Sequence, residues 1–521
     1  MYKEILKNIK PRKYQEEIYN SCKDKNCLVI LPTGIGKTLI ALMLSINRQK
    51  EHPDKKILFL APTKPLAEQH LEYFKKNLPE LFAELTLFTG KVDAEKRKKL
   101  WQNSDIIFST PQCISNDIKN NLYHLSDVSL LIEDEAHRCL KNYSYTYIAE
   151  KYKEQAKNQR ILGLTASPGT DRKTIENIAK TLGIETIEIR TRESEDVREY
   201  LQELKVEIIK INFPEEIKEI AEIIRAIYQK KIQEIKNRKL LFEPPTKTNL
   251  LKIQANLMDS IRRGNRNFNV LAGVSVLAQA IKLSYLIELL ETQTLFSSDR
   301  YIKSIFEQAK TNKSKASQNI IKNPEFNKAY IKIKELLAKN IEHPKLKILK
   351  NIIEESIKEN KKNKTIIFCQ YRDSIIRISE ELEKIEGIKL KIFVGQSKKQ
   401  GTGLSQKEQQ QIMSEFKEGK VNLIIATSIA EEGLDIPEVN SVIFYEPIPS
   451  AIRKIQRMGR TARLMKGKTY ILLTLGTLDE IFYYASRSKE KRMYKTIDLI
   501  KKDMENKKQE KGGENPQKKL F

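Results

Sequence analysis

Eight residues near the start of the chain, Leu31 to Thr38, have the types and spacing of a loop that binds phosphate. Gly34 and Gly36 can adopt positive φ angles and let backbone N–H groups face an anion, and the positive end of a following helix adds to the attraction. Lys37 supplies a full charge, and the Thr38 hydroxyl suits Mg²⁺. The loop therefore predicts a nucleoside-triphosphate site. Because the strict pattern begins with Gly where this chain has Leu, an ordinary glycine turn stays the alternative for this stretch alone.

Two adjacent carboxylates, Asp134 and Glu135, follow an apolar run about 100 residues later. In phosphoryl transfer one such carboxylate holds Mg²⁺ and the other takes a proton from the attacking water. Taken alone, an acid pair at a strand end is often surface charge. Together with Lys37 and Thr38, the acid pair favours a catalytic role over surface charge. His137 is expected to be a local hydrogen-bonding residue.

A third group lies near the other end of the chain, where Arg460 and Arg463 are three residues apart in a basic segment that starts at Gln456. This spacing places both guanidinium groups on one face of a helix. Two such groups aimed at one point suit a triphosphate whose charge must be neutralised during transfer. An ordinary basic helix is the alternative.

The elements that must position these groups alternate between short apolar runs and amphipathic stretches, which is typical of parallel sheets covered by helices. We expect an α/β fold with two parallel-sheet domains and a helical insertion domain between them. Chemistry in such sheets gathers at the carboxyl ends of the strands, and the candidate residues follow strands. The predicted strands are 27–31, 57–61, 85–88, 105–109, 130–133, 160–165 and 186–189 in the first sheet, and 365–369, 390–393, 422–426, 441–445 and 469–473 in the second.

The predicted domain boundaries follow changes in this pattern. The first α/β domain covers 1–203, a helical domain with basic residues that could line a nucleic-acid path covers 204–340, and the second α/β domain covers 341–490. The segment 491–521 is rich in Lys, Glu, Asn and Gly, which predicts a basic, disordered tail.

The overall charge points to a polyanionic partner. The chain has 94 Lys and Arg against 68 Asp and Glu, a net charge of +26. Nucleic acid is the expected partner and an anionic membrane surface the competing one. The charged opening argues against a signal peptide, and the lack of an 18-residue apolar run argues against a membrane span. The segment 270–290 reads as a buried helix. Five scattered cysteines indicate a reducing compartment, so we expect a cytoplasmic, nucleoid-associated protein.

In order along the chain, these blocks resemble the motifs of a superfamily 2 helicase of the DEAH type. The matching segments are 12–15, 32–38, 61–67, 109–112, 134–137, 165–167, 426–435 and 456–463. Within that superfamily, the segments 393–396, 403–406, 431–435 and 444–450, together with the helical insertion, resemble Hef, the archaeal helicase for forked DNA, and the Fanconi anaemia group M protein.

The resemblance implies RecA-like domains, ATP with Mg²⁺ as cofactors, and a role for each matching residue. It places Arg12 and Gln15 at adenine, Thr33, Gly34, Gly36 and Lys37 at the phosphates, Thr38 and Asp134 at Mg²⁺, and Glu135 at the attacking water. Gly433 and Asp435 would approach the ribose and phosphates, and Gln456, Arg460 and Arg463 the γ-phosphate. The expected nucleic-acid contacts are Thr63, Lys64 and Thr110 on the first domain and Gln370, Arg372 and Thr427 on the second.

The resemblance further implies an ATP-dependent DNA helicase or translocase for forked or branched DNA in replication-fork repair and recombination. The insertion is also similar in position to that of RIG-I-like receptors and Dicer, which keeps an ATPase stimulated by double-stranded RNA as the alternative. A scaffold that recruits other proteins is a third hypothesis. No XPF-type nuclease block is present, so a nuclease would be a separate partner, and Gln517 to Phe521 resembles a truncated peptide that binds a sliding clamp.

Overall fold

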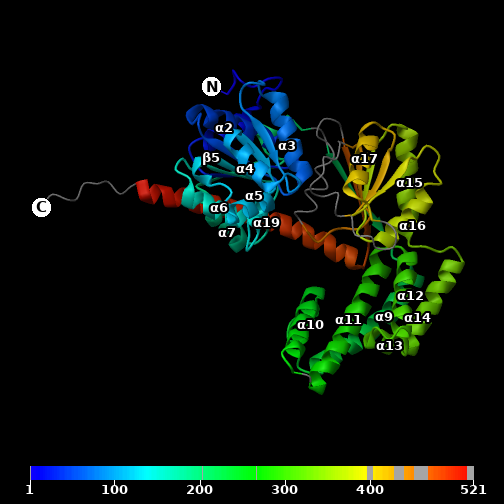
Figure 1. Cartoon of the computed structure of the whole chain (residues 1–521). Coiled ribbons are helices and arrows are strands. Elements are labelled where there is room, and N and C mark those ends of the chain that lie inside the picture. The colour runs from blue at the N-terminus through cyan, green and yellow to red at the C-terminus, as the bar shows by residue number, and fades with distance from the viewer. Residues whose placement is uncertain are drawn as a thin grey trace.

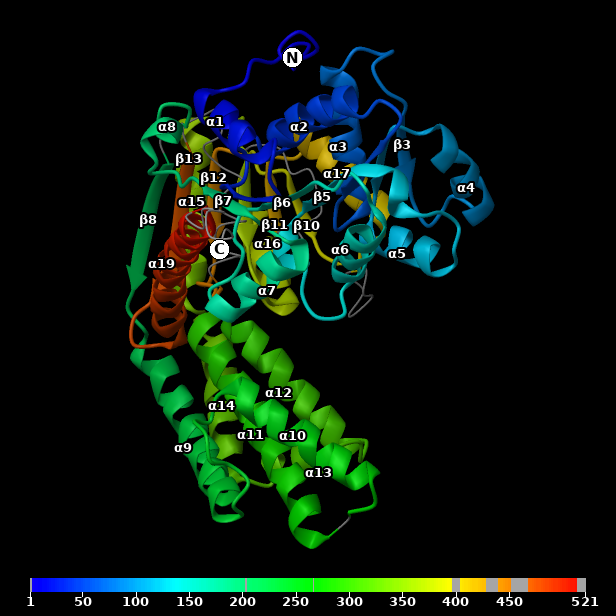
Figure 2. The same cartoon turned by 90° about the vertical axis from the view of Figure 1, so that its left-hand side faces the viewer.

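The computed structural model describes residues 2–201, 204–265, 267–395, 403–427, 439–450 and 467–512, apart from the side chains of 204, 505 and 507–512. Two parallel sheets and a helical bundle make up these residues (Figure 1). The bundle adjoins the second sheet domain and extends away from both sheets (Figure 2). The predicted α/β fold with a helical domain between two parallel-sheet domains is confirmed.

The first sheet has seven parallel strands within the described residues, in the order β3-β4-β2-β5-β6-β1-β7. Each lies within two residues of its predicted ends, and alternate residues of β1 and β2 join separate apolar cores on the two faces of the sheet. The strands are β1 (Cys27–Ile30), β2 (Lys56–Leu60), β3 (Leu85–Phe88), β4 (Ile106–Ser109), β5 (Val128–Asp134), β6 (Ile161–Thr165) and β7 (Thr186–Ile189). The helices are α1 (Lys13–Cys22), α2 (Lys37–Glu51), α3 (Lys64–Asn77), α4 (Ala94–Asn103), α5 (Pro111–Lys119), α6 (Ser144–Gln155), α7 (Arg172–Leu182) and α8 (Glu195–Arg198), with 3-10 turns η1 (Leu125–Asp127) and η2 (Ala136–Arg138).

The second sheet has six parallel strands among the described residues, in the order β10-β11-β9-β12-β13-β8. The strands are β8 (Leu204–Ile211), β9 (Thr365–Phe368), β10 (Leu390–Phe393), β11 (Leu423–Ala426), β12 (Ser441–Phe444) and β13 (Gly467–Thr474). Helices α15 (Pro344–Glu359), α16 (Arg372–Leu382) and α17 (Gln406–Lys417) belong to the same domain.

Strand β8 corrects a predicted boundary. The sequence assigns 204–211 to the helical insertion, but β8 pairs with β13 along its full length at the edge of the second sheet. An edge strand leaves part of its surface in water, and Val206 and Ile208 are 42% and 39% exposed. The sequence does show a β-rich run at 206–211 within the predicted insertion, and its mixture of Lys, Glu and Ile is that of an exposed edge strand. The helical insertion begins at α9 rather than at residue 204.

The bundle consists of α9 (Glu215–Asn237), α10 (Lys247–Arg262), α11 (Phe268–Thr292), α12 (Leu295–Lys310), α13 (Lys315–Ile321) and α14 (Pro324–Ala338). Helix α11 is long and apolar enough to cross a membrane by length and composition, and it is the one such helix among the described residues. Its apolar side chains join the bundle's two cores, as expected for a buried helix.

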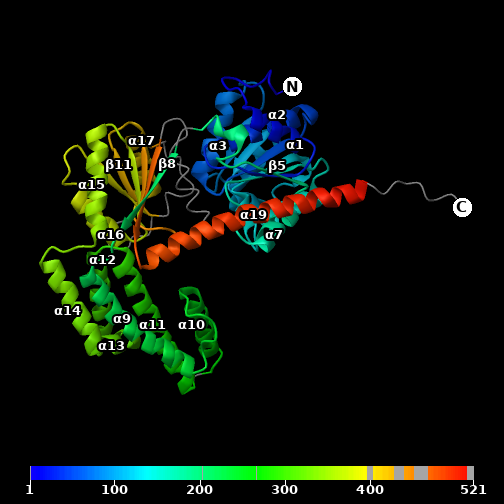
Figure 3. The same cartoon turned by 180° about the vertical axis from the view of Figure 1, so that it is seen from behind.

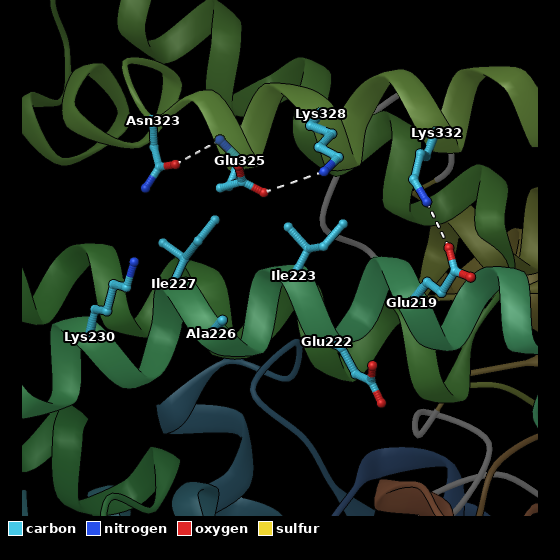
Figure 4. Close-up of a pocket in the computed structure, with 10 residues that line it drawn as sticks. All are labelled: Glu219, Glu222, Ile223, Ala226, Ile227, Lys230, Asn323, Glu325, Lys328 and Lys332. Carbon is cyan, nitrogen blue, oxygen red and sulfur yellow. Dashed lines mark hydrogen bonds and ion pairs between the residues drawn. The ribbon is translucent and has the colours of Figure 1, made fainter.

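A groove of about 450 Å³ lies between α9 and α14 (Figure 4). Lys332 pairs with Glu219 at 2.7 Å, and Lys328 pairs with Glu325 at 4.0 Å. Because glutamates offset two of its lysines, the groove is not a uniformly basic path for nucleic acid.

Helix α19 (Leu478–Gly512) leaves the second domain after β13 and crosses to the first (Figure 3). Met493, Ile497 and Ile500 are buried in a core of the first domain. Their spacing of four and three residues places them on one face of the helix. The prediction of a disordered tail from 491 is therefore wrong as far as Gly512, because abundant Lys and Glu mask this narrow apolar stripe.

A buried ion pair joins the root of α19 to the bundle and the second sheet. Lys345 at the start of α15 pairs with Asp479 at the start of α19, and both side chains are fully buried. Lys345 Nζ also donates to the Thr292 carbonyl at the end of α11 at 2.9 Å, and Asp479 Oδ2 accepts from Thr474 N at 3.0 Å. The three elements therefore meet at one polar cluster with matched charges.

Removal of one member of this pair should destabilise the protein strongly. Asp479→Ala leaves Lys345 buried without its anion, which costs about 3–5 kcal/mol, whereas the double variant Lys345→Met, Asp479→Leu removes both charges and should recover most of that loss. Urea denaturation followed by circular dichroism measures both. Equal destabilisation by the single and double variants would contradict the assignment of the loss to an unpaired charge.

His343 should make stability depend on pH at the same junction. It is 1% exposed, and Nδ1 accepts from Lys345 N at 3.4 Å. Burial, followed by the charge of Lys345, lowers the pKa of His343 well below its usual value. Below about pH 6.5 the unfolded chain binds a proton at His343 that the folded chain excludes. The free energy of unfolding therefore falls by up to about 1.4 kcal/mol for each unit by which the pH is lowered.

The matched variant is His343→Asn, which retains a helix-capping side chain but does not titrate. Its free energy of unfolding should fall less than that of the wild type between pH 7 and pH 5. If the free energies of unfolding of the two proteins changed equally with pH over this interval, His343 would not bind a proton on unfolding.

Candidate nucleotide-binding site

The loop between β1 and α2 has the backbone conformation that its glycines predict. Gly34 and Gly36 have φ angles of +84° and +88°, and Gly36 directly precedes α2 in a left-handed conformation. A Cβ atom on Gly36 would lie 2.2 Å from Gln15 Nε2. The dihedral angle therefore favours glycine at this position, and an added Cβ would also displace the Gln15 amide.

Helix α1 holds this loop through two buried side chains. The Tyr14 hydroxyl donates to the Ile35 carbonyl at 2.5 Å, and Gln15 Nε2 donates to the carbonyls of Ile35 and Gly36 at 3.3 and 3.4 Å. Gln15 Oε1 accepts from Arg12 N at 2.9 Å. The adenine contacts expected of Arg12 and Gln15 stay predictions, but the structure places Gln15 against the phosphate loop and Arg12 beside Gln15 and Tyr14.

Two polar side chains of the loop are suited to binding phosphate. Lys37 Nζ donates to the Leu31 carbonyl at 3.2 Å, which places the ammonium group over the loop. Thr33 Oγ1 is buried and has no hydrogen-bond partner among the described residues. An unpaired hydroxyl and an ammonium group on a glycine loop that leads into the N-terminus of α2 fit a triphosphate.

The predicted metal ligands Thr38 and Asp134 are brought together by His70, a residue that the sequence analysis missed. Thr38 Oγ1 lies 3.4 Å from His70 Nδ1, and His70 Nε2 lies 3.0 Å from Asp134 Oδ2. The described residues contain no cluster of three His, Cys, Asp or Glu side chains that could hold a metal. A magnesium ion with ATP takes most of its oxygens from phosphate and water, so a hydroxyl and one carboxylate suit it.

Glu135 has the charge state of a general base. Its backbone is left-handed, with φ +53°, and its Oε2 lies 3.2 Å from His137 Nδ1. Burial alone would raise the pKa of Glu135, but the hydrogen bond from His137 and the charges of His137, Lys37 and Arg138 lower it to about 2. The carboxylate is therefore ionised at neutral pH, as the abstraction of a proton requires.

Glu133, two residues earlier, has the opposite state. It is fully buried and its carboxyl oxygens have no hydrogen-bond partner among the described residues. Burial raises the pKa of Glu133 well above its usual value. Burial therefore disfavours the charged form of Glu133, which argues against a role as a second catalytic base.

The predicted nucleic-acid contacts of the first domain lie at the same edge of the sheet. Thr63 precedes α3 after β2, and Thr110 precedes α5 after β4. Lys64 pairs with Glu68 at 3.1 Å and is 36% exposed. The sheet therefore brings these residues to the edge that carries the phosphate loop, and their contact with nucleic acid stays a prediction.

In the second domain, Gln370 and Arg372 follow β9 and Thr427 follows β11. Gln370 N donates to Glu446 Oε1 at 2.8 Å, Arg372 Nη2 donates to the Gly395 carbonyl at 3.3 Å, and Thr427 N donates to the Phe393 carbonyl at 3.2 Å. The other predicted residues of this domain, Gly433, Asp435, Gln456, Arg460 and Arg463, lie outside the described residues, as does the segment 517–521. Their roles stay predictions.

Family models match the three parts of the fold. A model described as DEAD/DEAH box helicase matches residues 12–175, and one described as helicase conserved C-terminal domain matches 344–465. A model described as putative ATP-dependent RNA helicase, helical bundle, matches 216–343. Together these models cover the first domain, the second domain and the bundle.

Known proteins resemble most of the chain. It is 36% identical over 494 residues to a putative ATP-dependent RNA helicase of Methanocaldococcus jannaschii, which covers 94% of this chain and 61% of the relative. It is 34% identical to the ATP-dependent DNA helicase fml1 of Schizosaccharomyces pombe, over 90% of this chain and 57% of the relative, and 32% identical to the mouse Fanconi anaemia group M protein homologue, over 94% and 26%. The chain thus spans less than two thirds of the length of these relatives.

Among solved structures, the helicase domain of Hef from Pyrococcus furiosus matches with a TM-score of 0.71 and 41% identity. The match covers 93% of this chain and 100% of that domain. The resemblance found in the sequence is confirmed over both sheets and the bundle.

Gly36→Ala should weaken nucleotide binding about tenfold or more. A left-handed residue with a side chain costs roughly 1–2 kcal/mol, about a factor of ten, and the added methyl group also displaces Gln15. Titration with a fluorescent ATP analogue measures the affinity. Gly90→Ala is the matched control because nothing lies within 4 Å of its added Cβ. Similar affinities for the two variants would contradict the placement of the nucleotide in this loop.

Proposed function

The chain belongs to the Hef-type group of DEAD/DEAH box helicases, and from this premise we propose that it is an ATP-dependent DNA helicase or translocase for forked or branched DNA. The observation that carries the proposal is the bridge through His70, which joins Thr38 of the phosphate loop to Asp134 of the acid pair. Replication-fork repair and recombination are the processes in which such substrates arise.

The site supports ATP hydrolysis by a division of labour among its residues. The loop N–H groups and Lys37 bind the phosphates, and Glu135 accepts a proton from the attacking water. Mg²⁺, when held by Thr38 and Asp134, neutralises phosphate charge. We assign the remaining neutralisation to Arg460 and Arg463 of the second domain, supplied across a cleft when the two domains close on ATP.

In this proposal the two domains close on ATP and open after hydrolysis. Each cycle would move the protein along the DNA. The proposed contacts on both domains would meet one strand at its phosphates, which carry little sequence information. The predicted selectivity is therefore for DNA structure rather than for bases. Support comes from the net charge of +26 and from two relatives, one named as a DNA helicase and the other as a Fanconi anaemia group M homologue.

Partners and location belong to the same proposal. From the sequence alone we propose a separate nuclease, a sliding clamp contacted through Gln517 to Phe521, and a cytoplasmic position at the nucleoid.

The test compares ATP turnover and strand separation on a DNA fork, single-stranded DNA, linear duplex DNA and duplex RNA. The fork should stimulate turnover most, and it should be unwound. Stimulation by duplex RNA alone would defeat the proposal and favour the RNA-stimulated ATPase.

Two variants locate the activity in the proposed site. Lys37→Ala should abolish turnover, whereas the exposed Lys99→Ala should leave it unchanged.

Arg463→Ala should slow turnover about 10³-fold or more with a smaller loss of ATP affinity, because its charge acts mainly in the transition state. Equal turnover by the arginine variant would remove the cross-domain contact from the mechanism.

A further inference from the structure

His70 occupies a position that links three elements of the first domain. It lies on α3, is 7% exposed, and reaches Thr38 at the start of α2 and Asp134 at the end of β5. Its ring packs against Phe59 of β2, with centroids 4.4 Å apart. Both ring nitrogens and one ring face are therefore engaged, which leaves the side chain little freedom to rotate.

The direction of the two hydrogen bonds suits the groups that they hold. An ionised carboxylate can only accept, so Nε2 donates to Asp134 Oδ2, and in the neutral ring Nδ1 then accepts from the Thr38 hydroxyl. This arrangement directs the Thr38 proton toward the ring and leaves the oxygen lone pairs for a cation. Asp134 Oδ1 is likewise left for a cation. Partners of this kind orient metal ligands and tune their affinity.

The same helix begins at the predicted nucleic-acid contacts. Thr63 immediately precedes α3, and Lys64 is its first residue. His70 lies six residues beyond Lys64, about 9 Å along the helix axis at 1.5 Å per residue. A helix of this length moves as a rigid unit, so a force on Lys64 displaces the ring of His70 relative to Thr38 and Asp134.

We propose that His70 is a positioning residue that couples the grip on nucleic acid at the start of α3 to the geometry of Thr38 and Asp134 in the ATP site. The coupling rests on the proposed function, whereas the positioning of the two ligands does not. His70 does not touch the reacting atoms in this scheme. It acts through Thr38 and Asp134.

A purely structural role predicts different behaviour. His70 stands beside the aromatic cluster of Phe59, Phe74 and Phe108, so a buried side chain of similar size would preserve the packing. His70→Leu fills the space without hydrogen bonds, and His70→Gln retains a donor and an acceptor. His52→Leu, in the turn after α2, removes a histidine away from the bridge and serves as the control.

The first measurement is the affinity for a fluorescent ATP analogue with Mg²⁺ and with EDTA. His70→Leu should reduce the gain in affinity that Mg²⁺ provides by about 10- to 100-fold and leave the affinity in EDTA unchanged. His70→Gln should restore part of the gain. An unchanged gain in His70→Leu, or an equal loss with and without Mg²⁺, would overturn the positioning role.

The second measurement is the ratio of ATP turnover with and without fork DNA. The ratio should fall in His70→Leu and recover in part in His70→Gln, while urea denaturation shows similar stability for both. A ratio equal to that of the wild type, despite a reduced Mg²⁺ effect, would overturn the coupling. If the wild type itself shows no response to DNA, the proposed function and the coupling fail together, and the binding experiment still decides the positioning role.

Discussion

The first domain depends on a hydrogen-bonded bridge across the carboxyl edge of its sheet. Strand β6 separates β1 from β5, so the phosphate loop and the acid pair emerge two strand spacings apart, about 10 Å. His70 reaches from α3 to both Thr38 and Asp134 across that interval. A buried carboxylate also requires partners, and His70 supplies one. The parallel sheet thus brings the two motifs near each other, and one side chain from a neighbouring helix sets their spacing.

Most of this architecture could be predicted from local sequence because buried parallel strands are short, apolar and β-branched. The strands of both sheets carry this signal. The glycine loop and the acid pair are recognised instead by their residue types and by their position directly after strands. His70 carries none, since a single histidine in an amphipathic helix has no spacing that distinguishes it from a surface residue. The pairing of β8 with the second sheet and the ordered part of helix α19 were missed for a related reason. Each buries only a narrow face, so Lys and Glu dominate the composition of both, and the partner that covers the apolar face lies far away in sequence.

Helix α19 connects the carboxyl edge of the first sheet, where the predicted catalytic residues lie, to the second domain. Its root is fixed by the buried pair of Lys345 and Asp479, and its middle contacts the first domain where the Ser167 hydroxyl donates to Met493 Sδ at 2.8 Å. Ser167 N donates to Thr165 Oγ1, which lies 3.2 Å from His137 Nδ1. A continuous set of contacts therefore runs from an element rooted in the second domain to the partner of Glu135. Relative motion of the two domains must bend α19, slide it over its apolar contacts, or shift the Thr165 network.

The pKa values of the acidic residues in the site depend more on neighbouring charged side chains than on burial. Glu133 is fully buried and Glu135 retains some exposure. Burial raises the pKa of Glu133, whereas His137, Lys37 and Arg138 lower that of Glu135 to about 2. Lys37 comes from the loop after β1, and His137 and Arg138 come from the turn after β5. These two segments therefore offset the desolvation of Glu135 and keep its carboxylate charged in the folded site. The sheet order that creates the phosphate cradle also keeps ionised the residue that is to take a proton from water.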